Sequence, residues 1–428
     1  MSFKRWFTGV TIGGPESGGD AAARTQRFPV TSLAMLNKEV NKNPDEVITG
    51  RMAKRGFLID SYDAAAEIAC DLAACPAIGM AMASALGGDV ETPVEVGGAI
   101  LVRYTGSDAS CKLAVAAAQI TSETGALGAE EADSDFGTAG DLDTSEMNVD
   151  SVVAAIDAYT DYSAKVVFGD DSVPGDALVT ITATQAKGRN AIIFFGKTGS
   201  GMYLHKMKSL LTNVEYPHEY TLQFDGSGGA DNLGNGAMFD SFSLSADLKA
   251  RATISFNAIM KGVGDEGTAS TLAVHKAKPM RFNDGMTFVA GTEHTYTKNI
   301  SLDLANNHDT DEGYGQGSLY RQSHVRGALE ATGSVTIRAN SVTESERLKH
   351  ASNAKSSLLS IFKGSGDEYM LFDLPQIMYT DESKSEGGVS LEQQLTYEAV
   401  YDNTENPYDD MLSVYMVSHD SATYGYSA

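Results

Sequence analysis

The sequence predicts a mainly β protein: two tandem β-sandwich or barrel domains, each with a flanking helix, and a small α+β module inserted in the first domain. Three observations support this fold class. Apolar and polar residues alternate over long stretches, short segments recur in the same order in both halves of the chain, and the spacing between the recurring segments is unequal. Period-two alternation is typical of strands with one buried face.

The clearest alternation runs from Phe242 to Leu248 and continues in the same phase over 252–258. A shorter alternation covers 334–338, and another stretch leads from Leu391 into Tyr401. Each predicts a strand with one face on the core. Both halves of the chain are therefore interpreted as mainly antiparallel sandwiches or barrels.

Two segments predict core-packing helices. In the second half, apolar residues recur at helical spacing from Leu348 to Ile361, after a capping-box pattern at 343–346 and before a glycine stop at Gly364. In the first half, the range 64–86 is rich in alanine and is interrupted by Pro76.

Four short matches indicate that the chain contains a duplicated unit. They pair Ser32-Leu33 with Ser301-Leu302, Arg55-Gly56 with Arg326-Gly327, Glu219-Tyr220 with Glu368-Tyr369, and Ser243-Leu244 with Ser390-Leu391. Two copies are too few for a solenoid but suit a subunit that supplies two quasi-equivalent positions to a ring. Chance similarity among short β-rich segments is the alternative.

The spacing of the matches locates an insertion. Gly87 and Glu219 are far apart, whereas Gly364 and Glu368 are close together, so the first copy carries roughly 130 extra residues, the size of a small domain. Within it we expect a helix over 148–159 and strands at 99–104, 113–120, 164–168, 178–182 and 191–195.

These observations divide the chain into four parts. The predicted parts are an N-terminal arm at 1–27, a discontinuous first domain at 28–89 and 198–265, an inserted surface module at 90–197, and a second domain at 266–428. The arm is rich in glycine and is expected to become ordered against a partner. Two polar, turn-rich segments, 37–50 and 306–317, are expected to be exposed loops.

Charge and cysteine usage narrow the class of protein. The net charge is −25, with 57 acidic against 32 basic residues, which disfavours tight wrapping of DNA because phosphate binding needs clustered lysine and arginine. Solubility, a salty habitat or a wall that DNA slides past would each explain the charge. Three cysteines give no disulfide framework, and we expect neither a signal peptide nor a membrane span, hence assembly in a cytoplasm.

Catalytic, cofactor and metal sites are not predicted. Gly196-Lys197-Thr198 lacks the first glycine of a phosphate-binding loop. The acidic run 309–313 lacks the spacing and terminal glutamate of a calcium loop. The eight histidines have no partner at zinc-ligand spacing. A glycosidase stays open, because its two carboxylates can lie far apart in a chain.

Three segments carry a family resemblance. Ser301–Asn307 ahead of a polar loop, Tyr369–Pro375, and the closing Tyr397–Asp402 strand are similar to segments of the tail tube proteins of tailed bacteriophages. The resemblance covers about residues 28–95 and 205–428, and the inserted module lies outside it. A shell or surface-layer protein built of β modules, or another structural virion protein, is the alternative, and an enzyme on a β scaffold is a further one.

The resemblance implies a structural role and no enzymatic activity. It implies rings that stack into a tube in the virion tail, with DNA as a passenger in the channel and with tape measure, tail terminator and baseplate proteins as partners. A duplicated chain would form a pseudo-sixfold ring as a trimer, and hexamers are the alternative. The lumen candidates are Asp247 and Glu392, and the inter-ring loop candidates are Asn37, Asn41, Asp45, Glu46, Asp309 and Asp311.

Overall fold

The structure is a computed structural model of the 428-residue chain. It describes residues 2–7, 9–13, 23–32, 34–44, 57–87, 92–116, 118–133, 136, 140–169, 173–209, 218–226, 231–266, 270–274, 277–309, 313–314, 318–339, 341–364, 366–387, 390–401 and 410–424. Within these residues the protein is mainly β, as predicted, with helices at Pro76–Leu86 (α1), Val149–Asp157 (α2) and Ser341–Ser352 (α3).

Two sets of strands follow the same order along the chain. The N-terminal unit consists of α1 and the strands β2 (Gly9–Gly13), β3 (Gln26–Arg27), β4 (Ala34–Pro44), β5 (Phe57–Asp71), β15 (Tyr220–Asp225), β16 (Asp231–Asp247), β17 (Thr253–Met260) and β18 (Gly262–Glu266). The C-terminal unit consists of α3 and the strands β19 (Arg281–Val289), β20 (Thr292–Glu293), β21 (Thr297–Ala305), β22 (Glu330–Arg338), β23 (Ser356–Lys363), β24 (Tyr369–Gly387), β25 (Ser390–Ala399) and β26 (Ser413–Ser418).

The strand pairings of the two units are the same. In the N-terminal unit the pairs are β2–β3, β2–β15, β15–β16, β16–β18, β16–β17, β17–β5 and β5–β4. The corresponding pairs of the C-terminal unit, in the same order, are β19–β20, β19–β23, β23–β24, β24–β26, β24–β25, β25–β22 and β22–β21. All are antiparallel. The longest strands, β16 and β24, each carry a one-residue bulge, at Asp240 and at Thr380. The chain therefore contains one topology twice.

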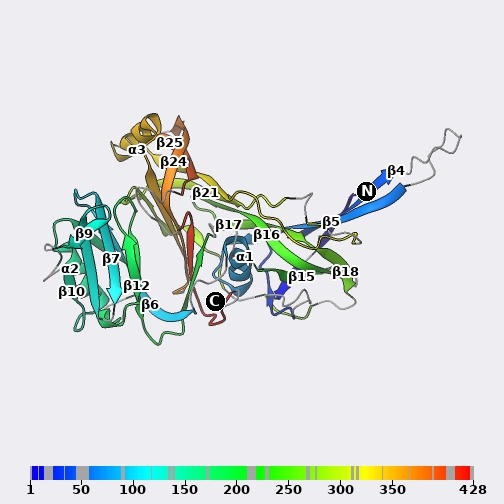
Figure 1. The fold of residues 1–428 in the computed structure, drawn as a ribbon, viewed down its shortest axis with the longest axis horizontal. Helices are drawn as coiled ribbons and strands as arrows, with labels where there is room; N and C mark the ends of the chain where they lie inside the picture. Colours follow the sequence, from blue (N-terminus) through cyan, green and yellow to red (C-terminus); the bar gives the residue numbers. More distant parts are fainter. Residues whose placement is uncertain are drawn as a thin grey trace.

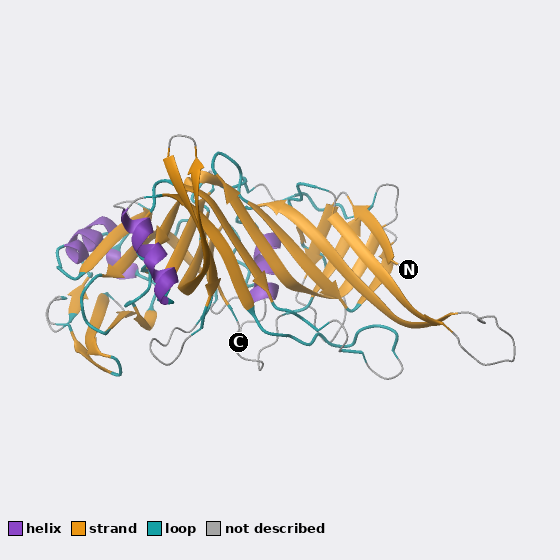
Figure 2. Cartoon of the chain, turned by 90° about the horizontal axis from the view of Figure 1, so that it is seen from above, coloured by secondary structure: helices purple, strands orange, loops and turns teal. Residues whose placement is uncertain are grey.

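One antiparallel sheet runs through both units. Its strand order is β1-β4-β5-β17-β16-β21-β22-β25-β24, where β1 is Ser2–Phe7. We call it the central sheet. The pair β16–β21 joins the two units, and the sheet does not close into a barrel within one chain. Its two ends lie on opposite sides of the molecule, with the long β4–β5 ribbon projecting at one end and the β24–β25 hairpin at the other (Figures 1 and 2).

The core lies on one face of the central sheet. Phe242, Leu244, Phe256 and Leu302 alternate with polar residues and are buried, as the alternation predicted. Helix α1 is buried along its whole length and packs on β16, β14 (Tyr203–Lys208), β2 and β3. Helix α3 packs on β24. Apolar burial on this face is the main term that stabilises both units.

The inserted segment has a hydrophobic cluster of its own. Its elements are β6 (Val94–Tyr104), β7 (Ser110–Ala116), β8 (Gln119–Ala126), β9 (Ala129–Ala132), β10 (Asp141–Asp143), α2, β11 (Tyr162–Phe168), β12 (Ile181–Gln185) and β13 (Ile192–Lys197). Buried residues between Ile100 and Phe194 form one cluster against α2. Where the sequence predicted one strand at 113–120, the structure has the hairpin β7–β8. The predicted boundaries at 90 and 197 stay predictions.

Three predicted elements differ from the structure. Residues 64–71 belong to β5 rather than a helix, because pairing with β4 and β17 on both sides overrides the helix propensity of alanine. Pro76 starts α1 rather than interrupting a helix, since proline is favoured at the first helical position. Residues 356–363 form strand β23, because a short apolar run suits a buried strand as well as a helix.

Two further expectations are corrected. Helix α3 already begins at Ser341, and Glu346, placed by the sequence in a capping box, instead accepts hydrogen bonds from Ser356 and Tyr379 at 2.6 and 2.9 Å. The proposed arm at 1–27 contains β1, β2 and β3, and β2 is buried. Two of the four short sequence matches do not coincide with the structural equivalence. Tyr220 lies on β15, which corresponds to β23 and not to the strand β24 of Tyr369, and Ser243 corresponds through the two bulges to Ser383 on β24, not to Ser390 on β25. Leu33, Arg55 and Gly56 of the other two matches lie outside the described residues.

A buried ion pair attaches the inserted segment to the C-terminal unit. Arg189 Nη2 lies 3.2 Å from Asp373 Oδ2 and 3.4 Å from Asp410 Oδ1, and all three side chains are buried. Burial raises the pKa of Asp373 to about 6, although Arg189 acts in the opposite direction. The arginine therefore compensates two carboxylates that have little access to water.

We predict that Arg189→Met lowers the free energy of unfolding by about 3–5 kcal/mol, because it leaves buried carboxylates without their cation. The matched control is Lys165→Met, which removes an ion pair to Glu293 on the C-terminal unit whose two side chains are 45% and 32% exposed and is expected to change stability by less than about 1 kcal/mol. Urea unfolding followed by circular dichroism measures both. Equal effects of the two substitutions would contradict the prediction.

Candidate functional site

The face of the central sheet that turns away from the core is polar and acidic. Polar and acidic residues occupy most of the alternate positions of its strands, with a few alanines among them, and lie opposite one another across the ladder, as Ser255, Ser243, Asp303 and Thr332 do. Acidic residues outnumber basic ones on the described strands of this face. Its acidic residues include Glu39, Glu67, Asp71, Asp247, Asp303, Glu330, Asp381, Glu392 and Glu398, and Arg338 is a basic residue among them.

Local contacts hold several of these carboxylates in place. Arg251 Nη1 lies 2.8 Å from Asp71 Oδ2, and Lys298 forms an ion pair with Glu392. Ser243 donates a hydrogen bond to Asp303, and Asn299 donates one to Asp247. The described part of this face is therefore a network of hydroxyl, amide and carboxylate groups with a negative balance, and it shows no cluster of the cations that bind phosphate.

The two lumen candidates from the sequence both lie on this face. Asp247 is exposed at the end of β16, whereas Glu392 on β25 is mostly covered and paired with Lys298. Sequence reasoning missed Glu67, Asp303 and Glu398, which are exposed on the same face. The sequence shows that these residues lie at alternate positions of their strands. It does not show the register between strands, which decides whether residues of different strands lie on the same face of the sheet.

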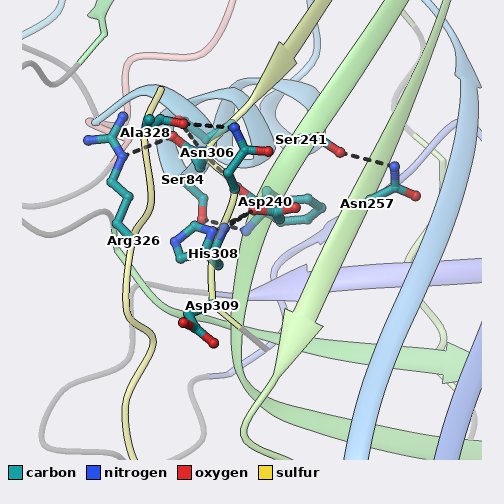
Figure 3. Close-up of polar contacts among 12 residues, drawn as sticks. Ser84, Asp240, Ser241, Asn257, Asn306, His308, Asp309, Arg326 and Ala328 are labelled. Atoms are coloured by element: carbon teal, nitrogen blue, oxygen red, sulfur yellow. Dashed lines mark hydrogen bonds and ion pairs between the residues drawn. The ribbon is translucent and has the colours of Figure 1, made fainter. Parts of the chain in front are cut away.

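A buried asparagine fastens the junction between the two units (Figure 3). The side chain of Asn306, just after β21, donates to the carbonyl oxygens of Ala85 on α1 at 2.9 Å and of Phe239 on β16 at 3.4 Å. Arg326 Nε donates to Asn306 Oδ1 at 3.0 Å. The Asn306 side chain thus connects the C-terminal unit to helix α1 and to the bulged strand β16 of the N-terminal unit.

The bulge residue Asp240 adds a second contact at this junction. Asp240 Oδ1 accepts the backbone N–H of His308 at 3.0 Å and lies 2.6 Å from His308 Nδ1 (Figure 3). Burial raises the pKa of Asp240, but the hydrogen bonds from His308 more than offset this and hold it below its usual value. His324 Nε2 lies 2.8 Å from the Gly236 carbonyl oxygen, and burial lowers the pKa of this imidazole to about 4.

The segment after β21 folds back onto the N-terminal unit. The rings of Tyr320 and Tyr62 stack with centroids 5.1 Å apart, and the Tyr62 backbone N–H donates to the Leu319 carbonyl oxygen at 2.8 Å. Tyr314 donates a hydrogen bond to Asp63, whose carboxylate lies 3.7 Å from Arg321. The region in which the sequence predicted an inter-ring loop therefore makes contacts between units of the same chain.

The inter-ring candidates fall in three places. Asn37 and Asn41 belong to strand β4, so the predicted loop at 37–50 instead begins as a ribbon, whose backbone groups pair with β5 up to Pro44. The exposed Asp309 pairs through its backbone with Val325, and its side chain points away from Asp240 in Figure 3. Asp45, Glu46 and Asp311 lie outside the described residues.

The comparisons with known proteins identify one family. A family model described as phage tail tube protein matches residues 8–399, which is nearly the whole chain. No curated protein matches it. Across the described residues there is no cluster of three or more potential metal ligands, and no described helix has the length and apolar character needed to cross a bilayer.

We predict that Asn306→Leu weakens the junction, because it leaves Arg326 and two carbonyl groups without a hydrogen-bond partner. Each buried polar group left unsatisfied costs about 1–3 kcal/mol, so a loss of several kcal/mol is expected in urea unfolding. Asn257→Ala is the control: this asparagine is exposed and bonds only to Ser241 among the contacts described, and a change within about 0.5 kcal/mol is expected. An equally mild Asn306→Leu would refute the role of the asparagine.

We also predict that acid weakens the junction through His324. An unfolded histidine binds its proton near pH 6.5, whereas the folded pKa is about 4, so the unfolded state binds more protons as the pH falls from 6.5 to 4. The folded state loses on the order of 3 kcal/mol of stability across that window.

His324→Gln should remove this loss, because glutamine keeps a donor for the Gly236 carbonyl group and does not titrate. Unfolding free energies of wild type and variant are compared from pH 7.5 to 4, with His419→Gln as an exposed control. Parallel curves for wild type and His324→Gln would show that His324 does not carry the effect.

Proposed function

Because this chain belongs to the phage tail tube protein family, we propose that it assembles into rings that stack around a channel through which DNA is delivered to the host. Family membership makes the protein a structural component of a phage tail. The ring, the channel and the symmetry are our proposal. It assigns the chain no catalytic role.

The observation that carries the proposal is the β16–β21 junction. It joins the end of one unit to the start of an equivalent unit, with the register Ser241↔Ala305 to Asp247↔Asn299. The same two kinds of edge recur at the ends of the central sheet: β24 corresponds to β16, and β4 corresponds to β21. Repeating the junction between chains would extend the sheet around a closed ring, which leaves no unpaired edge.

The corresponding register follows from the ladders. The bulges align Ser241 with Asp381, and tracing the partners across β17–β5–β4 and β25–β22–β21 aligns Asn37 with Asp303. Since Ser243 faces Asp303 within the chain, Ser383 of one chain would face Asn37 of the next. Three chains with two units each would give the pseudo-sixfold ring.

The polar face of the central sheet is the proposed channel wall. Its negative balance would repel the phosphate groups of DNA and keep the strands from adhering during passage. The exposed Asp247, Asp303, Glu67 and Glu398 would contribute most, whereas Glu392 is partly neutralised by Lys298. The opposite face holds the core, and the inserted segment, which lies outside the central sheet, would decorate the tube.

The proposed location and partners rest on the family match. The chain would be made in the host cytoplasm and act in the virion tail. A last ring still presents β4–β5 ribbons and acidic channel walls, which tail terminator and baseplate proteins would meet at the tube ends. The tape measure protein would occupy the channel during assembly.

We predict that Ser383→Cys combined with Asn37→Cys forms disulfides between chains in assembled tubes. Residues opposite each other in an antiparallel ladder have Cα atoms about 5 Å apart, which a disulfide spans. The three natural cysteines are free and buried, so they interfere little. Non-reducing gels of oxidised tubes should show two- and three-chain species and nothing larger.

The control pairs Ser383→Cys with Glu39→Cys, which shifts the register by two residues on the same face and should cross-link poorly. A ladder that continues to six chains would keep the tube and contradict the trimer. Absence of any link at Asn37, in tubes seen by electron microscopy, would contradict the proposed junction.

A further inference from the structure

We propose that β1 is a place-holding strand, which covers the assembly edge of β4 in the free chain and is displaced by β24 of a neighbouring chain when the ring forms. This inference rests on the proposed ring and adds the step that controls its assembly. The partner is a second copy of the same chain.

The position of β1 is the first reason. It pairs antiparallel with β4, in the register Ser2↔Glu39 to Phe7↔Ala34. In the C-terminal unit, the corresponding edge of β21 is covered by β16. Strand β1 therefore occupies on β4 the place that β16 occupies on β21, and in the described part of the chain β21 pairs only with β16 and β22.

The two pairings exclude each other. The outward-pointing N–H and C=O groups along one edge of a strand can form one ladder. The β24 edge from Asp381 to Gly387, continuing the register of β16, would need the β4 residues that β1 now pairs with. Among the described residues, this stretch of β24 has β25 alone as a neighbouring strand, so a partner edge is available on the other chain.

The exchange changes little of the fold. Strand β1 contributes a six-residue ladder, and the internal junction, on which the new β24–β4 pairing is patterned, has seven paired residues. The backbone hydrogen bonds lost with β1 would therefore be replaced. Phe7, at the end of β1, is 2% exposed, and its ring lies 5.5 Å from that of Phe224. Phe7 and the buried strand β2 that follows would stay in place while Ser2–Trp6 dissociates from β4.

Covering the β4 edge also has a physical purpose. An exposed strand edge is a template for pairing with other chains, and β4 extends beyond the body in a long ribbon with β5 (Figure 2). A short strand from the same chain blocks that edge at no cost in solubility. Ring closure would then require a correctly placed β24 to compete with β1, which disfavours random edge-to-edge association of free chains.

Cross-strand charges add a salt dependence to the exchange. In the transferred register, Asp381 would lie opposite Glu39, and Glu382 would lie opposite Lys38. The like-charged pair opposes pairing and the opposite pair favours it. Asp381 and Glu39 are both exposed, so salt is expected to screen their repulsion.

A reversible disulfide tests the proposal on the full-length chain. Lys4→Cys with Asn37→Cys places two thiols opposite each other on β1 and β4. When the free chain is oxidised before assembly, the lock should reduce tube formation at least tenfold in light scattering and electron microscopy, and dithiothreitol should restore it. In a second experiment the same variant is first assembled into tubes under reducing conditions and is then oxidised. The Lys4–Asn37 disulfide should then fail to form.

The matched control locks the internal junction with Ser241→Cys and Ala305→Cys, which are opposite each other in β16–β21. This junction persists in the ring, so the oxidised control should assemble as well as the reduced one. Two outcomes would contradict the proposal that β24 displaces β1. One is normal assembly of the oxidised Lys4→Cys/Asn37→Cys variant, and the other is a disulfide between positions 4 and 37 that forms within existing tubes. A missing Ser383–Asn37 link between chains tests the ring junction itself, so the two proposals fail separately.

Discussion

The constraint on which the rest of the structure depends is that every strand edge of the central sheet needs a partner. The chain satisfies this inside by joining β16 of one unit to β21 of the next, and it secures the join with buried polar contacts. Because the two units share one topology, the same solution is available at both ends of the sheet. In the proposed ring, each chain would therefore bind the next through another copy of a contact that it already contains.

The polar contacts at the junction explain why the two units keep one relative orientation. Asn306 bonds to a helix carbonyl and a strand carbonyl at once, and Asp240 stands at the bulge of β16, whereas the equivalent bulge of β24 has Thr380. Apolar packing tolerates some sliding, whereas directional hydrogen bonds in a buried site do not. The register of the internal ladder is therefore held by these few side chains.

Sequence reasoning predicted the mainly β class, the helix of the inserted segment and the alternation on β16 and β17, because these depend on local periodicity. It placed Asp247 and Glu392 on polar positions but could not align their strands, since register depends on partners far away in the chain. It took 64–71 and 356–363 for helix because alanine and short apolar runs are ambiguous without their neighbours. The duplication is clear in the pairings, yet the short matches at Tyr220 and Ser243 lie at non-equivalent positions, because short β segments resemble one another by chance.

The central claim is that three chains close one ring by repeating the internal junction. The most direct measurement is end-on averaging of purified tubes, or of tubes grown from the expressed chain, by electron microscopy. Each chain carries one inserted segment outside the central sheet, so the account predicts three outer projections per ring around a central hole. Six projections per ring, or filaments without a hole, would contradict it.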